Sequence, residues 1–339
     1  MNPTPKSFAA QGYGFNFQWI YSWSPSAVHR AADHKALDFM ARHGFGFVRV
    51  PTDYRFWIRD HRYFEPDDAV LQVFDGYLEQ TRAREMHLSL NLHRAPGYCI
   101  NRNDLEIHNL WADEIAQDAF VFQWEGFARR YKGVPSRFLS FDLLNEPPEI
   151  GQYGFTRDIH QAVMRRTVAA IRAIDPDREI VIDGLAGGHL AMPELADLGT
   201  VHSGRGYQPM PVSHYQASWW SEHVGLPPPV YPGTPWNGVI WNRQTLAEFY
   251  APWREVQAKG VAVHIGEFGC YDKTPNDVAL RWFADLFDVY REFGWGYSMW
   301  GFEGAFGIID HGRPGARWET IDGYRVDRDL LELMVNSRR

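Results

Sequence analysis

The chain alternates short apolar runs with longer amphipathic stretches, and this alternation limits the possible folds more than any other feature. Eight runs have the length and composition of β-strands: residues 13–17, 45–51, 86–93, 138–146, 179–185, 199–207, 261–269 and 295–302. Helical periodicity follows most of them, at residues 33–43, 68–84, 113–131, 157–174, 245–259, 276–293 and 327–335. Only a short helix is expected after the fifth run. Almost uniformly apolar strands separated by helices are typical of a parallel sheet buried on both faces.

The number of strands favours a closed barrel over an open sheet. Eight strand–helix units are what a (β/α)8 barrel, or TIM barrel, requires. An open dinucleotide-binding sheet would carry Gly-x-Gly-x-x-Gly after its first strand, and this chain does not. We find no linker, low-complexity tract or short repeat in the 339 residues. The prediction is therefore an α/β protein with a single (β/α)8 domain over residues 1–339.

Charge and terminal composition restrict the partners. The formal net charge is -8 with both signs interspersed, which argues against nucleic acid and anionic membrane and favours an uncharged substrate. The N-terminus lacks the apolar segment of a signal peptide, so we expect a cytoplasmic protein, or a secreted one if a leader has been removed. Cys99 and Cys270 are expected to be free thiols at distant strand ends. We also expect a monomer.

Polar residues gather at the ends of the predicted strands, where barrel enzymes place their chemistry. They are Arg49, Asn91, His93, Asn145, Glu146, Arg205, Tyr207, His264, Glu267 and Trp300. Glu146 and Glu267 would face each other across the barrel mouth. A sugar acetal needs such a pair, because one acid protonates the leaving oxygen and one carboxylate attacks the anomeric carbon. The chain also has 14 tryptophans, many in irregular segments, where an indole face can bind a sugar ring.

Several motifs fall in order on consecutive strands: VRVPTDY, LNLHRAPGY, DLLNEPP, HIGEFG and MWGFEGAFGIID. Together they resemble glycoside hydrolase family 5, the cellulase-type group of retaining barrel enzymes. The resemblance extends from the first predicted strand to the last predicted helix. It implies a retaining β-glycoside hydrolase that uses no cofactor and no metal.

The same resemblance implies a role for individual residues. Glu146 is expected to be the general acid/base and Glu267 the nucleophile, with their carboxyls about 5–5.5 Å apart, as in a retaining site. The expected substrate-binding residues are Asn145, Arg49, His93, Tyr207 and Trp300. Asn145 would hold the 2-hydroxyl of the sugar, and Trp300 would lie beneath the glycone ring. Arg49 and His93 would support the carboxylates, and Tyr207 would contact the nucleophile.

The sixth predicted strand departs from the family pattern. The family has His-x-Tyr at its end, whereas this chain has Arg205-Gly206-Tyr207. Glu303 follows the eighth strand, where members of the family often carry arginine. One hypothesis is an ion pair between Arg205 and Glu303, which would keep a third carboxylate from acting on the nucleophile. In the alternative, Glu303 binds a sugar hydroxyl or solvent.

The motifs also bear on the alternative activities. A zinc hydrolase or a serine hydrolase is disfavoured, because the chain lacks His-Glu-x-x-His and Gly-x-Ser-x-Gly. A transglycosylase and an inactive carbohydrate-binding relative stay open. The resemblance favours an endo-β-1,4-glucanase (cellulase) acting on a β-linked oligo- or polysaccharide, with β-mannan, xyloglucan, β-1,3-glucan and aryl or small β-glucosides as alternatives. The loop of residues 218–243 is expected to shape the cleft.

Overall fold

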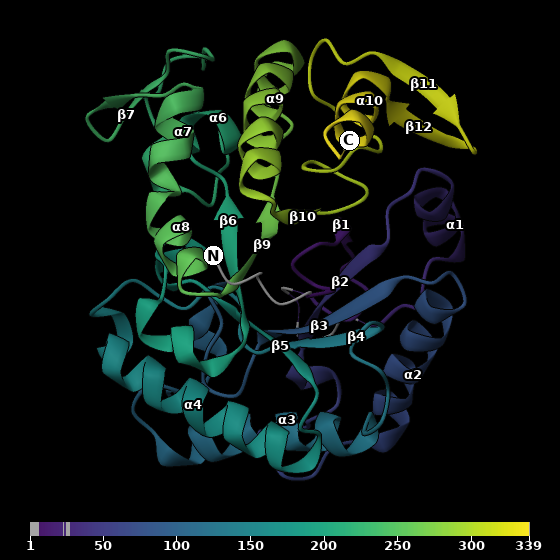
Figure 1. Ribbon diagram of the computed structural model, residues 1–339, viewed down its shortest axis with the longest axis vertical. Coiled ribbons are helices and arrows are strands. Elements are labelled where there is room, and N and C mark those ends of the chain that lie inside the picture. Colours follow the sequence, from purple (N-terminus) through teal and green to yellow (C-terminus); the bar gives the residue numbers. More distant parts are fainter. Residues whose placement is uncertain (1–6, 23, 25–27, 339) are drawn as a thin grey trace.

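The computed structural model describes residues 7–22, 24 and 28–338. Eight parallel strands form a closed barrel in the order β1-β10-β9-β6-β5-β4-β3-β2 (Figure 1). Their bounds are β1 Tyr13–Asn16, β2 Phe47–Asp53, β3 His87–Arg94, β4 Leu139–Asp142, β5 Glu179–Asp183, β6 Val201–Gly206, β9 Ala262–Phe268 and β10 Gly296–Met299. Each of the eight predicted runs overlaps one barrel strand, so the predicted (β/α)8 fold is confirmed.

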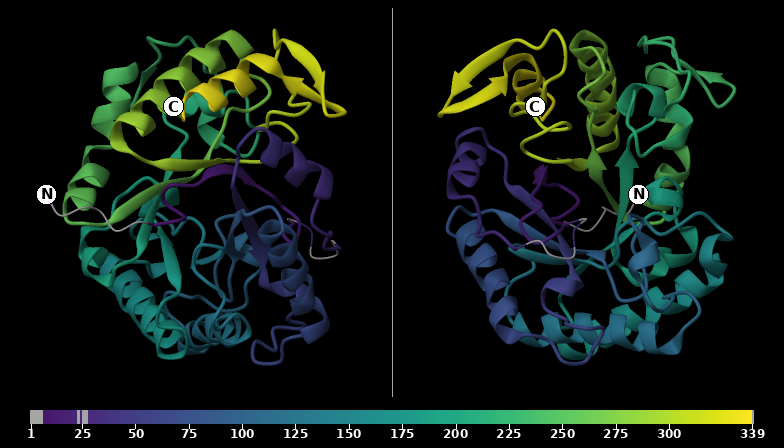
Figure 2. Two further views of the ribbon diagram at one scale, coloured as in Figure 1. Left: turned by 45° about the vertical axis from the view of Figure 1, so that its right-hand side comes forward. Right: turned by 180° about the vertical axis from the view of Figure 1, so that it is seen from behind.

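Helices cover the outside of the barrel (Figures 1 and 2). They are α1 His34–Arg42, α2 Asp68–Arg82, α3 Glu114–Arg130, α4 Arg157–Ile174, α7 Arg243–Phe249, α8 Ala251–Ala258, α9 Asn276–Phe293 and α10 Arg328–Asn336. Two four-residue helices, α5 Leu185–Gly188 and α6 Met210–Ser213, lie instead in the loops that follow β5 and β6. Several begin at a side chain that accepts a bond from the first turn, such as Asp33 for α1 and Thr156 for α4. These caps explain why the helices start where the sequence indicated.

The single helix predicted at residues 245–259 is wrong, because the structure divides it. Helix α7 ends at Phe249 and α8 begins at Ala251, with Tyr250 between them. Pro252 lies in the first turn of α8 and has no N–H to donate to the preceding turn, so one continuous helix cannot form there. The short helix expected after the fifth strand is present as α5, and a 3₁₀ helix, Pro193–Leu198, follows it.

One end of the barrel, which we call the base, lies at the N-terminal ends of the strands and is apolar. Phe47 there clusters with Ala9, Ala10, Val181, Val201 and Ala262. The carboxylate of Glu179 accepts hydrogen bonds from the backbone N–H groups of Phe8 (3.1 Å) and Ala9 (3.0 Å). These bonds tie the N-terminal segment across the base.

Two small hairpins lie outside the barrel (Figure 2). One pairs β11 (Trp318–Ile321) with β12 (Tyr324–Asp327), and the other pairs β7 (Pro235–Trp236) with β8 (Val239–Ile240). Cys99 and Cys270 are both buried free thiols, as predicted. Within the described residues, no helix has the length and hydrophobicity needed to cross a membrane.

Candidate active site

A cleft of about 910 Å³ opens at the C-terminal ends of the strands, and Glu146 and Glu267 both line it. Most of the predicted rim residues line this cleft or hydrogen-bond to a residue that does, but Asn91 and His264 do not. The amide of Asn91 donates instead to the backbone carbonyl of Asp142 at 3.3 Å. His264 was expected on this rim, but its Nε2 lies 3.3 Å from the carbonyl of Gly12 and its ring packs on Phe47 at the base. The reason is position along the strand, since His264 is three residues before Glu267 in β9.

Glu146 is delivered by an irregular extension of β4. The predicted strand runs to residue 146, whereas the regular ladder ends at Asp142. The backbone of Glu146 has a φ of 47°, which is unusual for a residue with a side chain. Two contacts hold this conformation: its N–H donates to Asp183 Oδ2 (3.1 Å), and Tyr98 Oη donates to its carbonyl (2.6 Å). A strained residue held in this way is typical of functional sites.

Burial changes the proton affinity of Glu146. It raises the pKa of this carboxyl to about 7, and the neighbouring charge of Glu267 adds to the effect. Arg205 Nε donates to Glu146 Oε1 at 2.9 Å and opposes the shift. Glu146 can therefore hold a proton near neutral pH and release it when its surroundings change, as a general acid/base must.

Glu267 lies within β9 and is surrounded by donors. Arg49 Nη1 donates to its Oε1 at 2.6 Å, and Arg205 Nη2 lies 3.3 Å from the same oxygen. Tyr207 Oη donates to Oε2 at 3.2 Å. Charge-assisted bonds from two guanidinium groups and a phenol stabilise the carboxylate form. Glu267 is thus in direct contact with two guanidinium groups, whereas Glu146 contacts one.

The amide of Asn145 has a defined orientation. Its Oδ1 accepts bonds from Arg49 Nη2 (3.0 Å) and Arg205 Nη2 (2.8 Å). Because guanidinium groups only donate, the amide nitrogen must point the other way. It lies 3.3 Å from Nε2 of His93. Burial and the nearby arginines lower the pKa of His93 well below its ordinary value, so this imidazole is neutral and can accept that bond.

Aromatic side chains form walls of the cleft. Trp300 stacks on His93, with ring centroids 5.3 Å apart and planes at 17°. Trp219 and Trp220 line the cleft from the loop after α6. The Trp219 side chain is about half exposed and packs edge-on against Tyr271. Flat apolar faces at several points of one cleft suit the faces of sugar rings.

Arg205 lies at the centre of the site, and the hypothesis that it pairs with Glu303 is wrong. Its three side-chain nitrogens donate instead to Glu146, Asp183, Asn145 and Glu267. Glu303 lines the cleft, and burial, with the charge of Asp33, raises its pKa. The pairing failed because the rim of β5 supplies Asp183, which is nearer to Arg205.

Sequence reasoning missed three buried residues of this network. Asp183 ends the fifth strand and contacts Arg205 through both carboxylate oxygens. Asp142 Oδ2 accepts a bond from Arg49 Nε at 2.6 Å, and Asn16 Oδ1 accepts one from Arg49 Nη1 at 2.9 Å. The rule that identified the other residues, a polar side chain at the end of an apolar run, would also have selected Asp183 and Asn16.

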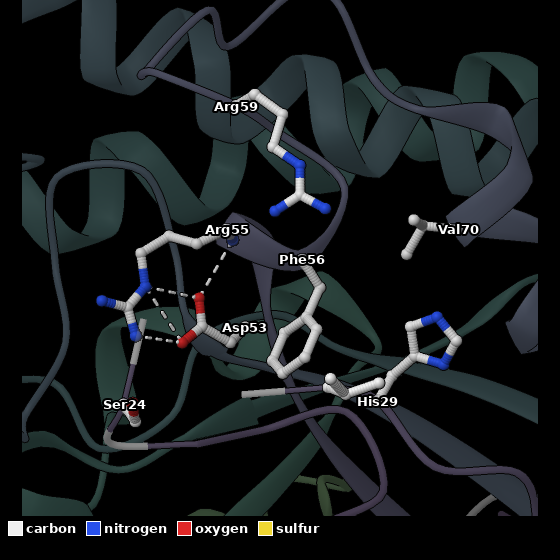
Figure 3. A pocket seen from close by; sticks show the side chains of 8 residues that line it. Ser24, His29, Asp53, Arg55, Phe56, Arg59 and Val70 are labelled. Carbon is white, nitrogen blue, oxygen red and sulfur yellow. Dashed lines mark hydrogen bonds and ion pairs between the residues drawn. The ribbon is translucent and has the colours of Figure 1, made fainter. Parts of the chain in front are cut away.

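A second pocket, of about 160 Å³, lies beside the loop after β2 (Figure 3). Asp53 is the single carboxylate among its described lining residues, and the guanidinium of Arg55 binds it through two nitrogens. This pocket therefore offers no pair of carboxylates for acid/base chemistry. Among the residues that the structure describes, no three His, Cys, Asp or Glu side chains are grouped to hold a metal ion.

A parallel barrel with one carboxylate just after β4 and another at the end of β9, both lining a cleft with aromatic walls, defines the class of (β/α)8 glycoside hydrolases. The chain belongs to glycosyl hydrolase family 5, since the profile described as "Cellulase (glycosyl hydrolase family 5)" matches residues 5–305. The protein is therefore a glycoside hydrolase, and the family is a retaining one.

Individual relatives agree with this assignment. A crystal structure described as that of a glycoside hydrolase is 63% identical, with a TM-score of 0.95, and the match covers 97% of this chain and 100% of that one. Endoglucanase C of Acetivibrio thermocellus is 26% identical over 315 residues, which are 85% of this chain and 89% of the relative. The Thermotoga maritima Cel5A mutant crystallised with cellobiose has a TM-score of 0.75 at 21% identity, over 96% of both chains. This last similarity concerns the fold.

Proposed function

We propose that this enzyme is an endo-β-1,4-glucanase in which Glu146 is the general acid/base and Glu267 the nucleophile. The observation that carries the proposal is the position of these two carboxylates in a long cleft. A further pocket of about 350 Å³ shares Gln18, Gly301, Glu303 and Gly304 with that cleft. A groove that continues past the reacting groups suits an internal bond of a chain better than a chain end. The endoglucanase name of the Acetivibrio thermocellus relative supports the same substrate class.

In the first step, Glu267 attacks the anomeric carbon and forms an ester bond with it. The bond from that carbon to the leaving oxygen breaks, and Glu146 gives its proton to this oxygen. The surroundings support these roles. Two guanidinium groups and Tyr207 donate hydrogen bonds to Glu267, while the pKa of about 7 lets Glu146 start the step protonated near neutral pH.

In the second step, Glu146 accepts a proton from water, whose oxygen attacks the anomeric carbon and releases Glu267. Two displacements at one carbon return it to the β configuration. The bond from Arg205 Nε to Glu146 stabilises the ionised form that this step needs. One side chain can therefore serve as acid and then as base, because burial favours one state and Arg205 the other.

The remaining predicted residues position the sugar in this proposal. Asn145 presents its amide N–H₂ to the 2-hydroxyl, since both arginines hold its oxygen. Trp300, with His93 stacked against it, is the platform beneath the glycone ring. Arg49 and Tyr207 act through the nucleophile, which they contact directly. No cofactor or metal takes part in either step.

Product analysis tests the proposal. The enzyme is incubated with carboxymethylcellulose, mannan, xyloglucan and β-1,3-glucan, and both reducing ends and viscosity are followed. We expect the fastest gain of reducing ends, with an early fall in viscosity, on the β-1,4-glucan. Proton NMR during the first minutes should show the β anomer of the new reducing end. An α anomer would contradict the two-step mechanism, and faster cleavage of another glycan would contradict the substrate.

A further inference from the structure

We infer that Asp183 and Arg205 form one positioning unit, which orients Glu146 and limits how strongly Arg205 favours its ionised form. Neither is a catalytic residue, because both act through the reacting carboxylates. The inference rests on the proposed function, since it takes Glu146 as the acid/base. It names Asp183, at the end of β5, as a residue that the reaction requires.

Asp183 is connected to Glu146 by two routes. Its Oδ2 accepts the backbone N–H of Glu146 at 3.1 Å, which helps hold the left-handed backbone at that residue. The same carboxylate binds Nη1 and Nη2 of Arg205, whose Nε donates to the Glu146 side chain. One buried aspartate thus holds the main chain of Glu146 directly and its carboxyl through Arg205. Neither Asp183 nor Arg205 has any exposed surface.

Asp183 also reduces the positive charge that Arg205 presents to Glu146. That guanidinium contacts both Glu146 and Glu267, and a full positive charge beside Glu146 would favour the carboxylate, which cannot donate a proton. Asp183 binds the far side of the same guanidinium and offsets part of this charge. Burial raises the pKa of Asp183, but Arg205 and Arg49 hold it below its ordinary value, so Asp183 stays ionised at neutral pH.

The other groups around Glu146 do not duplicate this role. The charged ones are Asp183 on β5, Arg205 on β6 and Glu267 on β9. Tyr98 and Tyr207 are buried phenols whose pKa lies well above the ordinary value, so they are neutral. Burial lowers the pKa of His189, beside Arg205, to about 4. Arg49 on β2 reaches the pair through Asp183, 3.5 Å away. Arg205 is thus the cation in direct contact with Glu146. Asp183, which binds it through two nitrogens, offsets its charge together with the more distant Glu267.

Removing the charge of Asp183 and removing that of Arg205 should move the basic limb of the kcat/KM–pH profile in opposite directions. That limb reports loss of the Glu146 proton in the free enzyme. Asp183→Asn leaves Arg205 uncompensated, so the limb should move to lower pH by about one unit. Arg205→Met removes the cation, so the limb should move to higher pH by a similar amount. The double variant should lie between the two single variants.

A control separates this effect from simple damage to a buried ion pair. Arg178 and Asp175 form another buried pair, at 2.7 Å, remote from the cleft. Asp175→Asn should lower the melting temperature and leave the basic limb in place. If Arg205→Met does not fold, Asp183→Asn and the double variant still give the decisive comparison, because neither leaves a buried aspartate without its arginine.

A measurement that needs no turnover distinguishes failure of this inference from failure of the proposed function. The pKa of Glu146 is read by NMR in protein labelled with δ-¹³C glutamate, and Glu146→Gln assigns the signal. A value that falls in Asp183→Asn and rises in the double variant relative to Asp183→Asn supports the pair. An unchanged value in both variants overturns it, whatever the activity. Near-parental activity of Glu267→Gln would instead overturn the proposed function.

Discussion

The mouth and the base of the barrel are built from the same eight strands, yet they differ in the side chains that they enclose. The mouth encloses Arg49 and Arg205 with four carboxylates, from Asp142, Glu146, Asp183 and Glu267. The base encloses the apolar cluster around Phe47 with neutral imidazoles beside it. Burying ion pairs contributes little net stability compared with apolar packing. Under the proposed function, the charges at the mouth serve the reaction rather than folding.

Two buried arginines, one near the base and one at the mouth, show the same difference between the two ends of the barrel. Arg178, near the base, donates to the backbone carbonyls of Leu139, Tyr131 and Val134 as well as to Asp175. Arg49, at the mouth, donates instead to the side chains of Asp142, Asn16, Glu267 and Asn145. One arginine therefore supports the chain path, and the other holds functional groups in place. Four predictions test this division, from the largest expected effect to the smallest.

Glu267→Gln should lower kcat by several orders of magnitude, because the covalent step is lost while shape and volume are kept. Its melting temperature should stay close to that of the parent. The matched change at the base is Glu179→Gln. It should lower the unfolding free energy by about 1–2 kcal/mol and leave kcat unchanged, because the two N–H groups bind different oxygens of Glu179 and an amide nitrogen would replace one of them. Activity of Glu267→Gln within tenfold of the parent would place the nucleophile elsewhere.

Arg178→Met should lower the unfolding free energy by about 2–4 kcal/mol, since it leaves three buried carbonyls and Asp175 without their donor. Urea unfolding measures this loss. Because Arg178 is remote from the cleft, kcat/KM of the folded fraction should stay within about twofold of the parent. A tenfold fall in kcat/KM with unchanged stability would show that the base also serves the reaction.

Trp300→Ala should weaken substrate binding by about 1–3 kcal/mol through lost stacking and buried apolar area. The signature is a raised KM for β-glucan with an unchanged melting temperature. Trp253 offers the contrast, because it is fully buried and packs behind β6. Trp253→Ala should lower the melting temperature without changing KM in the molecules that remain folded. A large fall in the melting temperature of Trp300→Ala would show instead that Trp300 is a core residue.

Mouth and base should also respond to pH with opposite signs. Burial raises the pKa of Glu146 to about 7, so the folded state keeps a proton that the unfolded state loses, and the unfolding free energy falls as pH rises from 4.5 to 7. Burial lowers the pKa of His87 to about 4, so the unfolding free energy falls as pH drops from 6.5 towards 4. Glu146→Gln and His87→Gln should each remove one of these slopes, which reach about 1.4 kcal/mol per pH unit. Urea unfolding between pH 4.5 and 7.5 measures both, and an unchanged slope in either variant contradicts the assignment.

The strand count, the helices and the positions of Glu146 and Glu267 could be predicted because they follow from local patterns. An apolar run that ends in a polar residue is visible within about ten positions of sequence. The break at Tyr250 was missed because the apolar periodicity continues across it, although Pro252 was the available signal. Asp183 carried the same strand-end signal as Glu267 and could have been found.

The sequence by itself determined a ring of eight strands with polar residues at their C-terminal ends, since period and composition are local properties of the chain. Only the tertiary structure decided the partners of those residues. Closure of the barrel brings Arg205 to Glu146, 59 positions away, and Arg49 to Glu267, 218 positions away. Such contacts depend on the stagger of neighbouring strands, as the shift in register between Gly204 and Arg205 illustrates. No local pattern encodes that stagger. The stagger of the strands placed Asp183, rather than Glu303, against Arg205.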